Sequence, residues 1–276
     1  MTTSYQNQSL LGPKEALSSK RARIREICRI SGVVGRSIAV VDHGEIVSQD
    51  TIGYRNLAER EPVTSDTIFH ITSLTKSFTG ACVDILRGQG KLSFDDPVQK
   101  HLRRVKTRDP ATTANATIAN LLGHRTGLQN PIGIWLGAHG KIKATGLPYH
   151  IFLQENILDP LGMTCTVVDK STRFLDDMSS AYGVTDNGLP SNVPLPEISA
   201  KSAMGPASSL MSTANDLVIY CKALMRSWHA QNGEHVETGE TGANEAVFSD
   251  VKWLFASLQI METPTAREKR LCCWMV

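Results

Sequence analysis

The chain has 276 residues, of which 41% are hydrophobic and 20% are charged, ordinary values for a globular protein that can bury a sizeable core. Its formal net charge is +2 and its sequence pI is about 8.2, which excludes a general electrostatic attraction to nucleic acid or membranes. No run of residues approaches the roughly 18 apolar residues that a membrane helix needs. Residues 1–14 are polar and lack the apolar centre of a signal peptide. We therefore predict a cytoplasmic protein with no nucleic-acid or membrane partner.

The six cysteines show no paired metal-binding spacing such as Cys-x-x-Cys. Several of them lie in apolar runs, where a reduced cysteine behaves as a small hydrophobic residue. We therefore expect reduced thiols at Cys28, Cys82, Cys165, Cys221, Cys272 and Cys273.

The chain begins with a predicted flexible arm, residues 1–19, followed by a helix from about Ser19 to Ile30. The basic stretch at 20–25 has two interpretations: a nucleic-acid-binding arm, or the solvent-facing side of an amphipathic helix. Apolar residues at helical spacing favour the second interpretation. The predicted buried face contains Ile24, Ile27, Cys28 and Val33.

Two strands are predicted within residues 37–47, on either side of the turn Asp-His-Gly-Glu at 42–45. Residues 53–65 are predicted to be a polar connection. Two strands alone do not make a stable sheet, so partner strands must come from elsewhere. The rest of the sequence offers few candidates.

The pattern becomes helical from Ser73 onward. Apolar residues then recur at helical spacing as far as Gly88, on one face of a predicted helix. That face contains Phe78, Ala81, Cys82, Ile85 and Leu86. Further helices are predicted up to Leu102, over 117–123, over 151–158, and from 211–216 to about Arg226, the last with Thr213 or Ser212 as N-cap. The polar string at 229–246 is predicted to be a loop.

The chemistry-bearing motif is Ser-Leu-Thr-Lys at residues 73–76, which matches Ser-x-x-Lys. Residues three apart share a helix face, so the Lys76 amine can reach the Ser73 hydroxyl and take its proton. Free N–H groups at the helix N-terminus can hold a developing oxyanion. The alternative is a helix-capping serine beside a solvated lysine, and spacing alone leaves both open. A second match, 249–252, lacks the apolar approach and the long amphipathic helix, so we assign it no catalytic role.

Five segments in order resemble the family of class C β-lactamases and related esterases and transpeptidases, for which Ser-x-x-Lys is a known motif. The first is the nucleophile segment, residues 67–79, and the second is the stretch that follows its helix, residues 90–98. Residues 121–128 are similar to Leu-Leu-x-His-x-Ser/Thr-Gly-Leu, residues 152–163 to a turn ending Pro-Leu-Gly-Met, and residues 205–217 to a Gly-rich segment before a late helix. The amino-acid sequence of these segments most resembles that of fungal members associated with secondary-metabolite pathways.

The resemblance implies an α+β fold: an antiparallel sheet flanked by helices, with a helical lobe inserted between early and late strands. It places one domain at 20–276 with the lobe at about 72–215. Ser73 becomes the nucleophile and Lys76 the general base. His124, expected to be buried in a turn, and Asp216, near a helix start, become scaffold residues without a catalytic role.

The sequence also departs from the family's pattern. Active members carry a Tyr-x-Asn or Ser-x-Asn motif after Leu-Leu-x-His, and a Lys-Thr-Gly or His-x-Gly strand near the end. Tyr-x-Asn occurs at 5–7 and 54–56, both before Ser73, and no tyrosine lies between Leu128 and Gly146. That interval is short and indicates a deletion near 143–146, while Tyr149 matches a later, structural tyrosine. The Thr-Gly pairs at 238–239 and 241–242 follow glutamate in the polar loop, and the final strands are expected to be missing, which leaves the sheet incomplete.

Three hypotheses follow. The chain is a serine hydrolase or acyltransferase that acts through an acyl-enzyme on an ester, thioester or amide, in secondary-metabolite biosynthesis. Alternatively, it is a catalytically impaired homologue that binds an acyl ligand or a partner, or a misassembled gene product that does not fold alone. The expected ligand is a small-molecule acyl substrate, and this chemistry needs no metal or organic cofactor.

Overall fold

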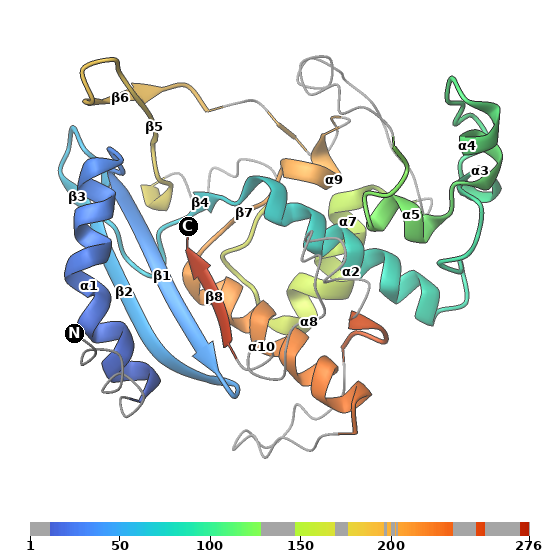
Figure 1. Cartoon of the computed structure of the whole chain (residues 1–276), viewed down its shortest axis with the longest axis horizontal. Helices are drawn as coiled ribbons and strands as arrows, with labels where there is room; N and C mark the ends of the chain where they lie inside the picture. The colour runs from blue at the N-terminus through green and yellow to red at the C-terminus, as the bar shows by residue number, and fades with distance from the viewer. Residues whose placement is uncertain are drawn as a thin grey trace, which may run out of the picture.

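A computed structural model describes residues 12–127, 147–168, 176–195, 198–199, 202, 204–233, 247–251 and 271–275 of the chain. Within these residues, one antiparallel sheet has the strand order β3-β2-β1-β8. The sheet stands at one side of the molecule and most of the helices at the other (Figure 1). This is the predicted β-lactamase/transpeptidase-like α+β architecture.

The centre of the sheet is the hairpin of β1 (Gly35–Asp42) and β2 (Glu45–Asn56). Its two-residue turn has positive φ at both positions, 50° at His43 and 83° at Gly44, the geometry that matches the twist of paired strands. The turn was predicted correctly. However, β2 continues to Asn56 and pairs with β3 (Glu61–Pro62), so the connection predicted at 53–65 is partly strand.

Each face of the sheet is covered by a helix (Figure 1). Successive residues of a strand point to opposite faces. Ile38 and Val40 line one hollow together with Ile24 of α1 (Pro13–Ile30). Ala39 and Val41 pack instead against α10 (Ala214–Gln231), in a buried cluster that includes Ala214, Val218, Cys221 and Met225. Cys221 is disulfide-bonded, so the expectation of a reduced thiol at this position was wrong.

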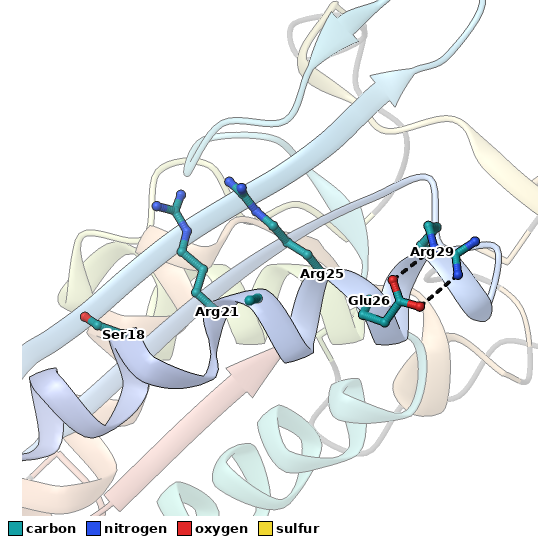
Figure 2. Close-up of a pocket in the computed structure, with 6 residues that line it drawn as sticks. Ser18, Arg21, Arg25, Glu26 and Arg29 are labelled. Atoms are coloured by element: carbon teal, nitrogen blue, oxygen red, sulfur yellow. Dashed lines mark hydrogen bonds and ion pairs between the residues drawn. The ribbon is translucent and has the colours of Figure 1, made fainter.

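Helix α1 begins at Pro13, six residues before the predicted start, because proline at the first helical position already has a helical φ. Its amphipathic character is confirmed, with Cys28 buried and Ile24 half-buried. The predicted apolar face was wrong in part, since Ile27 is 50% exposed and Val33 is 46% exposed. Figure 2 shows three of the basic side chains, Arg21, Arg25 and Arg29, all of which are exposed, and Arg21 forms an ion pair with Asp50 of β2.

The fourth strand, β8 (Leu271–Met275), pairs antiparallel with β1, with Cys272 opposite Val41 and Trp274 opposite Ala39. The described sheet thus includes one strand from this part of the sequence, and the expectation that the final strands are missing stays a prediction. The register of β8 against β1 could not be predicted from the sequence, since a strand of five residues shows little periodicity.

The helical side is built around α2 (Thr75–Gly88), whose stripe Phe78, Ala81, Cys82 and Leu86 is buried as predicted. It packs with α7 (Tyr149–Leu153), a π-helical turn (Gln154–Leu158) and α8 (Asp159–Leu161), which ends at Gly162 with φ of 71°. The core also takes residues of α10, where Phe78 stacks on Tyr220 with ring centres 4.0 Å apart.

Three short helices, two of them predicted, cover the end of this lobe (Figure 1). They are α3 (Val98–His101), α4 (Pro110–Asn115) and α5 (Ile118–Leu122). Helix α4 was not predicted, although Asp109 caps it by accepting from the N–H groups of Ala111 and Thr112. Thr117 and Asn120 form a capping box at α5, which matches the predicted helix at 117–123.

Two further strand pairs were not predicted. β4 (Phe69–His70) pairs with β7 (Met211–Ser212), and β5 (Ala181–Val184) pairs with β6 (Pro190–Val193). The polar loop predicted from 229 overlaps α10, which extends to Gln231. None of the helices in the described ranges is long and apolar enough to cross a membrane.

Candidate functional site

Ser73 lies where β4 gives way to α2. A single 3₁₀ turn (Thr72–Leu74) joins the two elements, and it presents Ser73 on the surface directly before the helix starts at Thr75. Thr72 has φ of +42°, in the left-handed region, which is a genuine outlier for a β-branched residue. Such strain persists only where surrounding structure holds it, and it concentrates at functional sites.

Two hydrogen bonds hold the backbone on both sides of this turn. The N–H of Ile71 donates to the carbonyl of Leu210 at 3.1 Å, and the N–H of Leu210 donates to Thr75 Oγ1 at 3.2 Å. Leu210 and Thr75 are fully buried. The strained turn is therefore fixed against the segment that precedes α10, far away in the sequence.

Lys76 completes the arrangement. Its Nζ lies 2.9 Å from Ser73 Oγ and 3.1 Å from the carbonyl oxygen of Ala207. Ala207 belongs to α9 (Gly205–Ser208), which lies against α2. Burial lowers the pKa of Lys76, because a half-buried ammonium loses hydration. A lysine with a lowered pKa, within hydrogen-bond distance of a serine hydroxyl at a helix start, has the parts of a base and nucleophile pair.

The sequence profile of the Beta-lactamase family matches residues 21–250, most of the chain and both residues of this pair. The chain belongs to the Beta-lactamase family.

Two bacterial proteins are among those similar to this chain. Protein Rv1367c of Mycobacterium tuberculosis is 26% identical over 208 residues, which cover 63% of this chain and 52% of that protein. The chain thus spans about half the length of this relative. Staphylococcus aureus protein flp is 29% identical over 100 residues, covering 36% of this chain and 20% of flp.

Solved structures show the same fold. The octameric penicillin-binding protein homologue from Pyrococcus abyssi has a TM-score of 0.67 at 24% identity, covering 87% of this chain and 59% of its own. A class C β-lactamase from Rhodobacter sphaeroides has a TM-score of 0.60 at 19% identity, covering 82% and 68%. The α+β fold of the Beta-lactamase family is therefore established for this chain.

The second Ser-x-x-Lys match has a structural role at its serine. Ser249 Oγ donates to Asp84 Oδ1 at 3.0 Å and accepts from Arg87 Nη2 at 2.7 Å. These bonds hold the segment 247–251 against α2. Lys252 lies outside the described residues.

The two predicted scaffold positions differ from each other. Asp216 is buried near the start of α10 and accepts from the N–H of Cys165 at 2.9 Å and from Thr166 Oγ1 at 2.7 Å, as a scaffold residue would. His124 has φ of 52° and an exposed side chain, so the expectation that it is buried was wrong. The turn after α5 lies at the surface, where no core encloses the ring.

The early Tyr-x-Asn match that the structure describes has a structural role. The match at 54–56 belongs to β2, where Arg55 forms ion pairs with Glu61 and Asp177, and Asn56 accepts from the next turn. The match at 5–7 lies outside the described residues, as do the interval 128–146 and the Thr-Gly pairs at 238–242. Tyr149 bonds to Thr79 rather than to Ser73 or Lys76.

Two features of the site were not predicted: the strained Thr72 and the carbonyl of Ala207. Neither has a local signal, because one is a backbone angle and the other is any residue's carbonyl. The Gly-Pro pair at 205–206 was the only sequence feature that could have pointed to this segment, since it resembles the family's Gly-rich segment.

A shallow surface hollow along α1 lies away from this pair. Figure 2 shows Ser18, Arg21, Arg25, Glu26 and Arg29 of its lining, which also includes Ala22. Arg29 is paired with Glu26 on the same helix, and Arg21 with Asp50 of β2. The hollow contains no nucleophile and base pair, so Ser73 and Lys76 remain the candidate active site.

Proposed function

We propose that the chain is a serine hydrolase or acyltransferase of the Beta-lactamase family that works through an acyl-enzyme on Ser73. The observation that carries the proposal is the 2.9 Å contact between Lys76 Nζ and Ser73 Oγ at the start of α2. The lowered pKa of Lys76 supports it, because a neutral amine is the form that accepts a proton.

In the proposed reaction, Ser73 Oγ attacks the carbonyl carbon of the substrate while its proton passes to Lys76 Nζ. The tetrahedral intermediate collapses, the bond to the leaving group breaks, and the leaving group takes the proton from Lys76. Water or another hydroxyl or amine acceptor then attacks the acyl group and gives its proton to Lys76. As the bond between the acyl group and Ser73 Oγ breaks, Lys76 returns this proton to Ser73 Oγ. No step uses a metal or an organic cofactor.

The proposed substrate is a small acyl compound with an ester, thioester or amide carbonyl. Ser73 is exposed, so an acyl group can approach it from solvent. The resemblance to fungal members of secondary-metabolite pathways supports an ester of such a metabolite. Comparing hydrolysis of an aryl ester, an aryl thioester and a chromogenic β-lactam tests which carbonyl the site accepts.

The first experiment is covalent labelling with a fluorophosphonate, whose phosphorus is attacked by an activated serine as fluoride leaves. Intact-mass and peptide analysis should place one adduct on Ser73. Ser73→Ala should abolish the adduct, whereas Ser249→Ala, in the second Ser-x-x-Lys match, should keep it. Labelling that persists in Ser73→Ala would contradict the assignment of the nucleophile.

A catalytically impaired homologue is the second candidate. Two observations favour it: the sequence has no tyrosine between Leu128 and Gly146, and the Tyr149 hydroxyl is bonded to Thr79. On this proposal the protein still binds an acyl compound but does not react with it. A cooperatively unfolding protein that gives no fluorophosphonate adduct would support the impaired homologue, and one that is labelled at Ser73 would exclude it.

A further inference from the structure

A chain of hydrogen bonds lies one helical turn beyond Lys76. Thr79 Oγ1 lies 2.5 Å from the carbonyl oxygen of Pro206 and 3.0 Å from the hydroxyl of Tyr149. Thr79 Oγ1 is the donor in both contacts, so its single proton is shared between the carbonyl oxygen of Pro206, the shorter bond, and the hydroxyl oxygen of Tyr149. Burial raises the pKa of Tyr149 well above its ordinary value, so Tyr149 stays protonated and uncharged.

This chain ends next to the acceptor that Lys76 uses. Pro206 and Ala207 are consecutive residues of α9, and Lys76 Nζ donates to the carbonyl of Ala207 at 3.1 Å. Lys76 and Thr79 are three residues apart and share a face of α2. The two side chains therefore hold two adjacent carbonyls of one short segment.

The Ala207 contact has a consequence for the direction in which the Lys76 amine points. A neutral amine has two N–H groups and one lone pair. When one N–H is held by Ala207, rotation about the terminal C–N bond is restricted, and the lone pair can be kept toward Ser73 Oγ, 2.9 Å away. A shift of α9 would release this constraint and let water reach the amine.

We propose that Thr79 and Tyr149 are positioning residues for the base. Through the bond to Pro206 they fix α9 so that the Ala207 carbonyl orients Lys76 toward Ser73 and keeps it poorly hydrated. The expected effect on the reaction of Ser73 rests on the proposed function. Its structural consequence, the environment of the Lys76 amine, is measurable whether or not Ser73 reacts.

The experiment uses Thr79→Val, which keeps the shape but removes the hydroxyl, with Thr79→Ser as the matched control that keeps it. Tyr149→Phe removes only the second acceptor of the Thr79 hydroxyl. In full-length protein labelled with ¹³C-lysine, NMR titration follows the Lys76 CH₂ next to Nζ, assigned by its absence in Lys76→Arg. The Lys76 pKa should rise toward its ordinary value in Thr79→Val, rise less in Tyr149→Phe, and stay at the wild-type value in Thr79→Ser.

Fluorophosphonate labelling adds the catalytic readout. Thr79→Val should slow labelling of Ser73 by about 10- to 100-fold, because misplacement of a reacting group by about 1 Å costs up to that factor. The midpoint of its pH profile should move upward with the Lys76 pKa, and Thr79→Ser should restore both. A purely structural role would lower the unfolding temperature without moving this midpoint.

The two readouts separate the possible failures. If wild-type protein gives no adduct but the Lys76 pKa responds to Thr79→Val and recovers in Thr79→Ser, the positioning role stands and the proposed function is wrong. If wild-type protein is labelled but the pKa and the labelling rate are the same in all folded variants, the positioning role is overturned. The positioning role would also be overturned if the Thr79→Ser protein folds but shows the same Lys76 pKa and labelling rate as Thr79→Val.

Discussion

The carboxylate of Asp84 accepts a hydrogen bond from the backbone N–H of Ser249 at 2.6 Å and so joins α2 to a segment 165 residues later in the sequence. The same carboxylate accepts from Ser249 Oγ, from the N–H of Asp250 and from Arg87. Asp84 is fully buried, and each of its donors would lose a partner if it were removed. Helix α2, which carries Lys76 and directly follows Ser73, is therefore fixed at its far end by one acid.

We expect Asp84→Ala to lower the free energy of unfolding by about 3 kcal/mol, since removing one partner of a buried charged network leaves the others unpaired. Urea denaturation of the purified protein measures this. Asp95→Ala is the control, because Asp95 is exposed, and it should cost no more than about 0.5 kcal/mol. Equal losses in the two variants would show that the Asp84 network does not stabilise the fold.

Lys76 should control the pH dependence of labelling at Ser73. Its pKa is lowered by burial, so the amine becomes neutral, and able to take the serine proton, at lower pH than an exposed lysine. The labelling rate should rise with pH and reach half of its maximum below the ordinary lysine pKa of 10.5. Fluorophosphonate labelling at a series of pH values measures the profile.

Lys76→Arg provides the matching variant, because arginine keeps the positive charge but does not deprotonate. The labelling rate should fall by about 100- to 10,000-fold, the range for loss of a general base. The remaining rate should lose its rise with pH. A wild-type rate in Lys76→Arg would show that the base is another group.

Sequence reasoning could predict the parts of the site that are local. Ser73 and Lys76 are three residues apart in the continuous helical stretch formed by the 3₁₀ turn and α2, so their spacing brings them together. The hairpin turn was equally local, because glycine at residue 44 suits the φ of 83° that a two-residue turn requires.

The remaining parts depend on tertiary contacts. Ala207 contacts Lys76 across 131 residues, and it does so through a carbonyl that every amino acid has. Thr72 takes a φ of +42° although its side chain disfavours that region, so surrounding structure overrides its preference. Strand β8 joins β1 through backbone hydrogen bonds, which leave no residue pattern to recognise. In each case the structure is determined by contacts with residues distant in the sequence and not by the residues of the segment itself.

Thr213 is the N-cap of α10 and accepts from the N–H of Asp216 at 3.1 Å. It is one of the two residues predicted for this position, the other being Ser212. Thr213→Ala should lower the free energy of unfolding by about 1 kcal/mol, because one N–H at the helix start loses its acceptor. Thr213→Ser keeps the hydroxyl and should retain most of the stability. Thermal unfolding followed by circular dichroism compares the variants, and an equal loss in both would mean that the methyl group, and not the cap, matters.

Asp216 should make the protein less stable as pH rises from acidic values. Burial raises its pKa above the ordinary 3.8, despite hydrogen bonds from Thr166 and Cys165 that lower it. An acid whose pKa is higher in the folded state binds its proton more tightly there. Its contribution to stability is therefore complete below the unfolded-state pKa and is lost as pH rises through the folded-state pKa.

Asp216→Asn tests this directly, because the amide stays neutral and its oxygen can still accept from Cys165 and Thr166. The free energy of unfolding of Asp216→Asn, relative to wild type, should increase as pH rises above the ordinary carboxyl pKa of 3.8, because the wild-type protein loses the contribution of the bound proton and the amide does not. Urea denaturation at several pH values gives this difference. Asp95→Asn, which changes an exposed carboxylate, should follow the wild-type profile. A difference for Asp216→Asn that does not vary with pH would mean that Asp216 has the same pKa in the folded and unfolded states, and burial would then not govern this site.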